Sequence, residues 1–278
     1  MPPTILHVSI TEVVRRGTIA LTASIGILVL TYCSAINVFP VSEDQKLGAQ
    51  FDAQIKSDNK EYPLLNNAGA NLYLQNIINT IIRAPEVEYD GKFPYKVEII
   101  KDDATVNAFC TPGGYIYVYT GLIKMLDSEA AIAGVLGHEI AHAERRHATS
   151  RMTKQLGVQT LMSIVLQNNT DQNIDLAANA IAGLGLLKNS RNDEDEADEY
   201  SFKYLLSSKT WYPGGIMYFF DKVKGRGGSS LDELFSTHPL AESRLENTIK
   251  RLKENNVPPP TEAQLRTKEY TAFKRKLN

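Results

Sequence analysis

The sequence predicts an α+β fold that is mainly helical and carries a small β-sheet. Three observations support this prediction. Several segments repeat apolar residues with a near-helical period, two short segments alternate as strands, and both strand segments lie between helical ones. With 278 residues, of which 43% are hydrophobic and 22% charged, the chain is long enough to bury the core of one large domain.

The N-terminal segment, residues 1–39, differs from the rest of the chain. Arg15 and Arg16 precede an uncharged, mostly apolar run from Gly17 to about Phe39, which is typical of an export signal. The run is also long enough to stay in a bilayer as an uncleaved anchor, because about 20 residues span the hydrocarbon core. Both alternatives place the folded domain outside the cytoplasm.

Cys33 follows Leu30-Thr-Tyr32, which partly resembles the lipobox at which bacterial lipoproteins are cut and lipidated. Tyr32 departs from that pattern, because the position usually carries a small residue. Lipidation of Cys33 and a simple apolar role in the signal are therefore two open alternatives. If Cys33 is lipidated, Cys110 is left as a lone thiol, so we expect neither a disulfide framework nor a cysteine-based zinc site.

The first half of the folded part combines helices and strands. Ser42 stands ahead of acidic residues, as a capping residue does at a helix start. Apolar periodicity, β-propensity and flanking turn residues then define four predicted elements: helices at residues 42–57 and 70–82 and strands at residues 95–100 and 115–120.

The second half is predicted to be helical. A long helix is expected to begin at Asp127 or Ser128, as its cap, and to run toward His147 or beyond. Residues 157–187 are apolar but are split by a polar run, so neither half reaches spanning length and we expect two packed helices. Further helices are expected from about Ser190 and at residues 243–254.

The domain is predicted to cover residues 40–256. Val257-Pro-Pro-Pro260 follows it, and the remaining residues are rich in lysine and arginine. We therefore expect residues 257–278 to form a polar, loosely ordered tail.

His138-Glu-Ile-Ala-His142 matches the HExxH pattern, in which two histidines at i and i+4 lie on one helical face and reach one metal ion. Glu139 then leans toward the metal's water and is the expected general base. An accidental match is expected roughly once in a hundred such sequences. The apolar, alanine-rich segment before the motif favours a buried helix over a surface helix with two incidental histidines.

A catalytic zinc site needs a third protein ligand and keeps one position open for water. His147 is the nearest candidate, but it lies five residues past His142 and so turns away from the metal-facing side of a helix. We interpret His147 as structural. The metzincin pattern is excluded, because it requires glycine and histidine where the chain has Arg145 and Ala148.

The acidic residues 190–199 lie on a predicted helix, and their default interpretation is a solvated charged face. Glu194 and Asp198, however, are spaced i,i+4 on one side of that helix. One of these carboxylates can bind zinc while the other accepts the free ring N–H of a ligand histidine.

The HExxH motif, followed by Ser190-Arg191, Glu194 and Ala197-Asp198, resembles the HtpX and CAAX-prenyl-endopeptidase group of gluzincin metallopeptidases, especially its soluble periplasmic members. The shared features extend from about Ser42 to Arg251. The resemblance implies a zincin-like domain that binds one Zn²⁺ per chain. It makes Glu194 the third ligand and Asp198 the carboxylate behind a ligand histidine.

Asn107-Ala-Phe109 with Pro112-Gly-Gly114 resembles the active-site edge strand of the same family. The resemblance implies that Asn107, Ala108 and Phe109 bind substrate, since an open edge pairs with an extended peptide. The alternative is an ordinary turn into a core strand. Cys110 stands where relatives often carry a small or polar residue, and a thiol near zinc makes an enzyme sensitive to oxidation.

Ser236-Thr-His-Pro239, followed by Arg244, is the last resembling segment. The resemblance implies that His238 and Arg244 stabilise the oxyanion of the tetrahedral intermediate. Taken alone, a histidine before proline is more often a loop residue. A further hypothesis places His238 in zinc's open position in a resting form.

The resemblance implies a zinc endopeptidase of the bacterial periplasm or cell envelope, bound to the membrane by its N-terminal segment, that degrades misfolded or misassembled envelope proteins. Two alternatives are a chaperone-like assembly factor with weak proteolysis and a non-proteolytic zinc hydrolase. Glu139 favours the enzyme, because a binding protein needs no base. The net charge of −2 gives no reason to expect a nucleic-acid partner. The sequence leaves the oligomeric state open.

Overall fold

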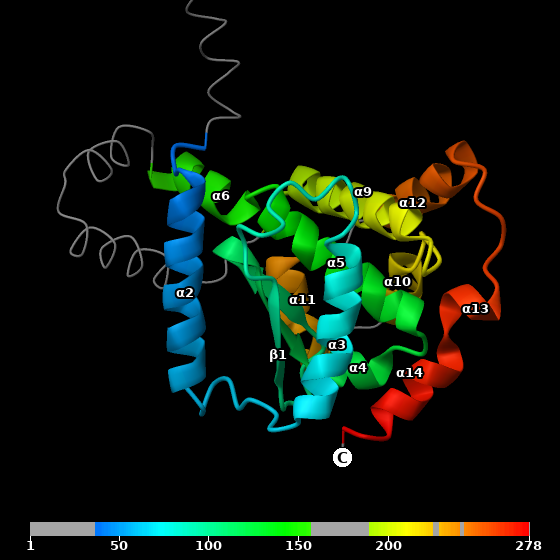
Figure 1. Ribbon diagram of the computed structural model, residues 1–278, viewed down its shortest axis with the longest axis horizontal. Coiled ribbons are helices and arrows are strands. Elements are labelled where there is room, and N and C mark those ends of the chain that lie inside the picture. Colours follow the sequence, from blue (N-terminus) through cyan, green and yellow to red (C-terminus); the bar gives the residue numbers. More distant parts are fainter. Residues whose placement is uncertain (1–36, 157–188, 225–227, 240–241, 278) are drawn as a thin grey trace, which may run out of the picture.

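The computed structural model describes residues 37–277, with gaps at residues 157–188, 225–227 and 240–241 (Figure 1). Cys33, nearly all of the expected N-terminal signal or anchor, and the two helices expected within residues 157–187 lie outside the described residues. None of the helices in the described part of the chain is both long and apolar enough to cross a bilayer.

The described chain is mainly helical with one small sheet, so the predicted fold class is confirmed. Its elements are, in order, α2 (Val41–Ser57), α3 (Ala68–Ile81), β1 (Lys96–Ile100), β2 (Ala108–Thr111), the 3-10 turn η2 (Pro112–Gly114), β3 (Tyr115–Tyr119), α4 (Thr120–Met125), α5 (Glu129–Glu144), α6 (His147–Leu156), α9 (Arg191–Ser208), α10 (Ile216–Val223), α11 (Ser229–Thr237), α12 (Glu242–Glu254), α13 (Glu262–Leu265) and α14 (Thr267–Lys274).

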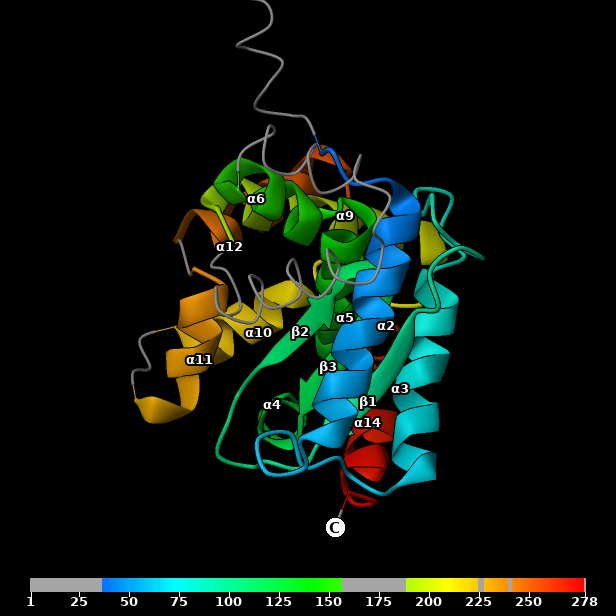
Figure 2. The same ribbon diagram turned by 90° about the vertical axis from the view of Figure 1, so that its left-hand side faces the viewer.

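The sheet has the strand order β1-β3-β2. The central strand β3 pairs in parallel with β1 and antiparallel with β2. Its side chains alternate: Tyr117 packs with Ile55 of α2, whereas Ile116 and Val118 belong to the main core with α3 and α5. Helix α2 therefore covers one face of the sheet and α5 lies behind the other (Figure 2). Strand β2 is an edge that packs against α5.

Helix α5 is the buried centre of the domain. Ser128 caps it by accepting a hydrogen bond from the backbone N–H of Ala131, as predicted. Gly134 allows α10 to approach closely, since a Cβ atom there would lie 2.3 Å from the backbone nitrogen of Ile216. The helix ends at Glu144, and Arg146 adopts a left-handed φ of 53° before α6 begins. The expected continuation of this helix through His147 is therefore wrong.

The start of α2 also differs from the prediction. Pro40 is the N-cap residue and makes no side-chain cap, so Ser42 lies inside the helix. Asp44, in the first turn, is buried and accepts hydrogen bonds from Arg146 and Thr149. This contact ties the start of α2 to the turn that follows α5.

The C-terminal residues pack on the domain and do not form the expected loose tail. Tyr270, Phe273 and Leu277 are buried in the main core. The hydroxyl of Tyr270 donates to the backbone oxygen of Ile123, and the Lys274 ammonium donates to that of Leu126. Helices α13 and α14 (red in Figure 1) thus run along the side of the domain. The expected polar tail was wrong because these three apolar residues are scattered among lysines and arginines in the sequence, yet share one face in the structure.

Candidate metal centre and active site

Helix α5 presents His138, Glu139 and His142 to one buried space. The two histidines lie one turn apart, and their Nε2 atoms are 3.0 Å from each other. All three side chains are buried. The arrangement follows from the i,i+4 spacing on a helix whose whole surface is covered by the domain.

Glu194 reaches the same space from α9. A reciprocal capping box of Ser190 and Asp193 fixes the start of this helix, and Glu194 stands in its first turn. One carboxylate oxygen, Oε1, lies 3.3 Å from Nε2 of His142, and the other, Oε2, lies 3.5 Å from Nε2 of His138. The side chain is fully buried.

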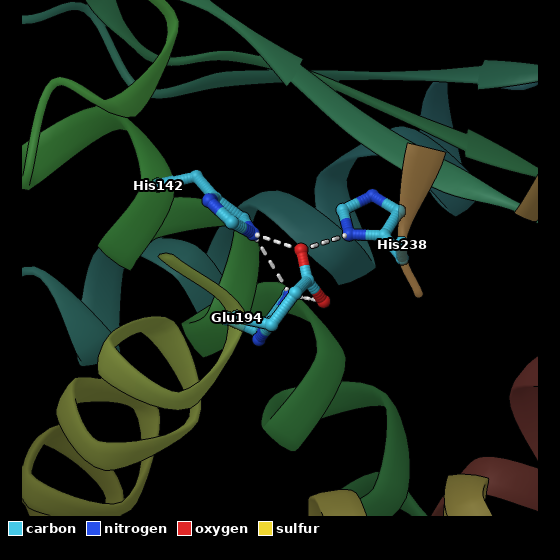
Figure 3. Close-up of side chains that lie close together, drawn as sticks. His142, Glu194 and His238 are labelled. Atoms are coloured by element: carbon cyan, nitrogen blue, oxygen red, sulfur yellow. Dashed lines mark hydrogen bonds and ion pairs between the residues drawn. The ribbon is translucent and has the colours of Figure 1, made fainter. Parts of the chain in front are cut away.

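His238 completes the group from the end of α11. Its Nδ1 atom lies 3.0 Å from Oε1 of Glu194, and its Nε2 atom lies 3.8 Å from Glu139. Figure 3 shows the rings of His142 and His238 on either side of the Glu194 carboxylate. One ligand atom from each of His138, His142, Glu194 and His238 lies within 4.8 Å of all the others.

These residues fit a divalent cation. Imidazole nitrogens and a carboxylate oxygen are the donors that zinc prefers, at about 2.0–2.2 Å. Around a tetrahedral ion such donors stand about 3.3 Å apart, and the contacts above span 3.0–3.5 Å. Oε2 of Glu139 is buried and has no hydrogen-bond partner among the described residues. An unpaired carboxylate oxygen beside the site suits a base that receives a proton from water.

Asp198 and Arg244 lie behind the first histidine. Oδ1 of Asp198 is 2.9 Å from Nδ1 of His138, which leaves Nε2 of that ring facing the site. Arg244 donates two hydrogen bonds of 2.7 Å to Asp198, and its Nη1 atom lies 2.6 Å from Glu194. These contacts make Arg244 a positioning residue. Its predicted role on the oxyanion stays a prediction.

His147 lies behind the second histidine. Its Nδ1 atom is 2.7 Å from Nδ1 of His142, and its Nε2 atom is 3.0 Å from Glu196. For Nε2 of His142 to face the site, its Nδ1–H donates to His147, and the Nε2–H of His147 donates to Glu196. The interpretation of His147 as structural assumed an unbroken helix. The left-handed Arg146 turns the chain and brings His147 back to the ligand.

Asn189 belongs to the site although no motif contains it. Its amide nitrogen lies 2.6 Å from Glu194, 3.3 Å from His142 and 3.2 Å from His238. Arg151 donates to the Asn189 side-chain oxygen. Because a guanidinium has no acceptor, this contact fixes the amide with its N–H groups toward the ligands. The residue precedes the cap of α9, and the sequence carries no signal for it.

The buried charges shift the titration of the site. Burial disfavours a charged ring, but contacts with Asp198 and Glu194 outweigh it and raise the pKa of His138 to about 9. Burial and the neighbouring His138 lower the pKa of His142. Burial raises the pKa of Glu139. Burial opposes ionisation of Glu194, yet His238 and the other histidines hold its pKa well below the usual range. His138 would have to give up its ring proton to hold a cation, because only the neutral ring offers a nitrogen lone pair.

Of the predicted substrate residues, Ala108 and Phe109 begin β2 and Asn107 directly precedes it. Asn107 is fully buried, and its side-chain oxygen accepts from the backbone N–H of Ala108. Ala108 lines a cavity beside Glu139, whereas the ring of Phe109 stacks on Tyr117, with ring centroids 5.0 Å apart. Their assignment to substrate binding stays a prediction.

Cys110 lines the cleft that also contains Glu139 and His142. Burial and the Glu139 carboxylate raise the pKa of its thiol, which lowers the fraction of reactive thiolate. Its sensitivity to oxidation stays a prediction.

Comparisons with known proteins agree with this geometry. The chain is 37% identical over 147 residues to the mitochondrial metalloendopeptidase OMA1 of Arabidopsis thaliana, over 52% of the chain and 29% of the relative. It is 31% identical to that of Saccharomyces cerevisiae, over 67% and 57%. It is 27% identical to the beta-barrel assembly-enhancing protease of Escherichia coli, over 80% and 46%.

The chain thus spans between 29% and 57% of the length of these three relatives. The family model of peptidase family M48 matches residues 69–252. This range includes the four residues that can hold a metal ion, His138, His142, Glu194 and His238, together with Asp198 and Arg244 behind them. Such a family implies a divalent metal, and the described histidines and Glu194 can hold one. The resemblance drawn from the motifs is confirmed, and the chain belongs to peptidase family M48.

Proposed function

We propose that this protein is a zinc-dependent endopeptidase. The observation that carries the proposal is the convergence of His138, His142 and Glu194 around one point, with the carboxylate of Glu139 beside it. Three protein ligands and an adjacent base are what metal-assisted peptide hydrolysis requires. The names of the relatives, two metalloendopeptidases and a protease, support the same activity.

The reaction would use the residues of this chain in simple roles. Zinc, when bound, would polarise the scissile carbonyl and lower the pKa of a water molecule. Glu139 would take a proton from the attacking water and pass it to the leaving amine. Its burial raises its pKa, which helps it to hold the proton between these steps.

His238 would act in two arrangements. In the resting form its Nδ1 atom joins the ligand group, beside Glu194. Substrate access would require this ring to withdraw, after which its N–H can donate to the oxygen that becomes negative. Arg244 would support that charge from behind Glu194, in line with its contacts there.

The proposed substrates are unfolded polypeptides of the bacterial envelope. Strand β2 is an edge of the sheet, and an extended peptide can add to it through main-chain hydrogen bonds. The name of the Escherichia coli relative points to the outer envelope as a setting. Residues 1–39 would tether the enzyme to the membrane, as an anchor or through lipid on Cys33.

The test is cleavage of casein by the purified, zinc-loaded full chain. We expect hydrolysis that is lost in Glu139→Gln and on treatment with a chelator, and restored by added zinc. Zinc bound at one ion per chain without any cleavage would instead support the chaperone-like alternative. Mass spectrometry of the mature N-terminus distinguishes lipidation, simple cleavage and retention of the anchor.

A further inference from the structure

The start of α2 holds the turn between α5 and α6, which lies behind the metal centre. Asp44, in the first turn of α2, is 1% exposed, and its two carboxylate oxygens have different partners. Oδ2 accepts a hydrogen bond of 2.9 Å from Nε of Arg146, and Oδ1 accepts one of 2.8 Å from the Thr149 hydroxyl. Figure 1 shows the start of α2 beside α6. Because Arg146 and Thr149 flank His147, a single carboxylate fixes the chain on both sides of that residue.

The backbone of Arg146 needs such support. Its φ of 53° lies in the left-handed region, which is unfavourable for a residue with a Cβ atom. Its guanidinium also donates to the backbone oxygen of Phe39, so the residues before α2 help to hold it. This turn brings Nδ1 of His147 to 2.7 Å from Nδ1 of His142. Only Arg146 and His147 therefore separate Asp44 from a proposed metal ligand.

Stability alone gives a weak reason for the buried pair of Asp44 and Arg146. Burial raises the pKa of Asp44, although Arg146 and Thr149 favour its charged form. Desolvation thus offsets much of the attraction, as it commonly does in buried ion pairs. The packing of α2 on α6 also has its own apolar contact, formed by Phe39, Leu47 and Met152. What the carboxylate adds is direction, because its charge-assisted hydrogen bonds define where the turn lies.

We infer that Asp44 is a positioning residue of the metal centre and acts on His142 through Arg146 and His147. The inference rests on the proposed zinc endopeptidase function. With Asp44 in place, His147 is held where it accepts the Nδ1–H of His142, so that Nε2 of His142 faces the metal. Without Asp44, the left-handed turn loses its main support, and His147 loses its fixed place behind His142. The metal centre thereby depends on a residue 102 positions before Arg146 in the sequence.

The test is the zinc affinity of the full chain, measured by titration against a competing chelator. We expect Asp44→Ala to lower the affinity by about tenfold, at the lower end of the range for residues behind a metal ligand, because it acts through two others. Asp44→Asn keeps an acceptor oxygen, so it should lose only about threefold, and it is the second variant should Asp44→Ala fail to fold. A wild-type chain that binds no zinc would contradict the proposed function itself. Folded Asp44 variants with wild-type affinity would overturn the inference alone.

A double variant tests the path through His147. If Asp44 acts by placing His147, then Asp44→Ala combined with His147→Ala should lower the zinc affinity no further than His147→Ala does alone. A combined loss equal to the product of the two separate losses would mean that Asp44 acts independently of His147, and would contradict the inference.

Glu129→Ala is the matched control for a general loss of stability. Glu129 is also a buried carboxylate paired with an arginine, Arg266, at 2.9 Å, but it lies at the opposite end of α5 from His142. Its removal should lower the stability measured by urea unfolding and leave the zinc affinity of the folded protein within about twofold of wild type. An equal loss of affinity in Glu129→Ala and Asp44→Ala would show that both changes act through stability, and would overturn the assigned role.

Discussion

The two histidines of α5 that we propose as metal ligands are held by different kinds of partner. His138 faces Asp198, which is fully buried and bonded to the guanidinium of Arg244. His142 faces another imidazole ring, His147, which is backed by Glu196, a carboxylate that is 39% exposed. A buried charged pair is costly to break, whereas an exposed ion pair contributes little. The same helix therefore has one firmly fixed ligand and one more loosely fixed ligand.

The difference between the two histidines follows from the elements that carry their partners. Asp198 stands one turn after Glu194 on α9, so a single helix carries both a ligand and the partner of another ligand. His147 reaches the site only because α5 ends and the chain turns at Arg146. A partner placed by a helix is positioned more rigidly than one placed by a turn.

We expect Asp198→Ala to have the largest effect. It leaves the buried guanidinium of Arg244 without its main partner, so the free energy of unfolding should fall by about 3–5 kcal/mol. It also frees the ring of His138, which should lower zinc affinity by about 100-fold. Urea unfolding measures the first quantity, and titration against a competing chelator measures the second.

Asp195→Ala is the matched control on the same helix. The Asp195 side chain is 44% exposed and pairs with Arg251, so its removal should cost less than about 1 kcal/mol. Equal losses in the two variants would mean that the Asp198 pair is no stronger than a surface contact.

His147→Ala should lower zinc affinity by roughly 30-fold, less than Asp198→Ala, because an imidazole acceptor is lost and not a buried carboxylate. The Nδ1–H of His142 is then left without its acceptor. His147→Gln, which keeps an acceptor, should recover part of the affinity in the same chelator titration. An Ala variant with unchanged affinity would show that His147 only fills space.

Asn189→Ala should lower zinc affinity by roughly tenfold, since it removes the N–H donor that holds Glu194. Asn189→Asp should not restore it, because a second carboxylate then faces Glu194. Metal titration checks both variants. If Asn189→Ala binds zinc with wild-type affinity, the amide does not support the metal ligands.

The predictability of these residues depends on how local their geometry is. His138, Glu139 and His142 follow from spacing alone, because one helix fixes their relation. Spacing also paired Glu194 with Asp198, and the family resemblance then assigned their roles. The contact of His147 with His142 was not predicted, because it depends on the left-handed backbone of Arg146. The periodicity of the sequence does not indicate that conformation.

The same reasoning explains the errors in the fold. The long helices and the tyrosine-rich strand β3 have strong periods and were predicted. Strand β2 has only four residues and was indicated by the family resemblance alone, and the apolar face of α14 is hidden among charged residues. Such short elements are stabilised by contacts with distant residues, such as Ile123, and local propensity does not reveal those contacts.

Glu196→Gln should have the smallest effect, and its pH dependence shows why. The contact with His147, together with Arg145, lowers the pKa of Glu196 from 4.5 to about 2 in the folded protein. A carboxylate with a lowered pKa stabilises the fold above about pH 4.5 and loses that contribution as the pH falls toward 2. Because the group is partly exposed, the contribution should stay below about 1 kcal/mol.

Urea unfolding of wild type and Glu196→Gln at a series of pH values measures this contribution. The difference between them should be constant near neutral pH, shrink below about pH 4.5 and disappear near pH 2. Zinc affinity at neutral pH should fall by no more than about threefold, since His147 keeps its contact with His142. A stability difference independent of pH would mean that the charge of Glu196 does not contribute to it. A loss of zinc affinity as large as that of His147→Ala would mean that the Glu196 charge, and not the ring, holds His142 in place.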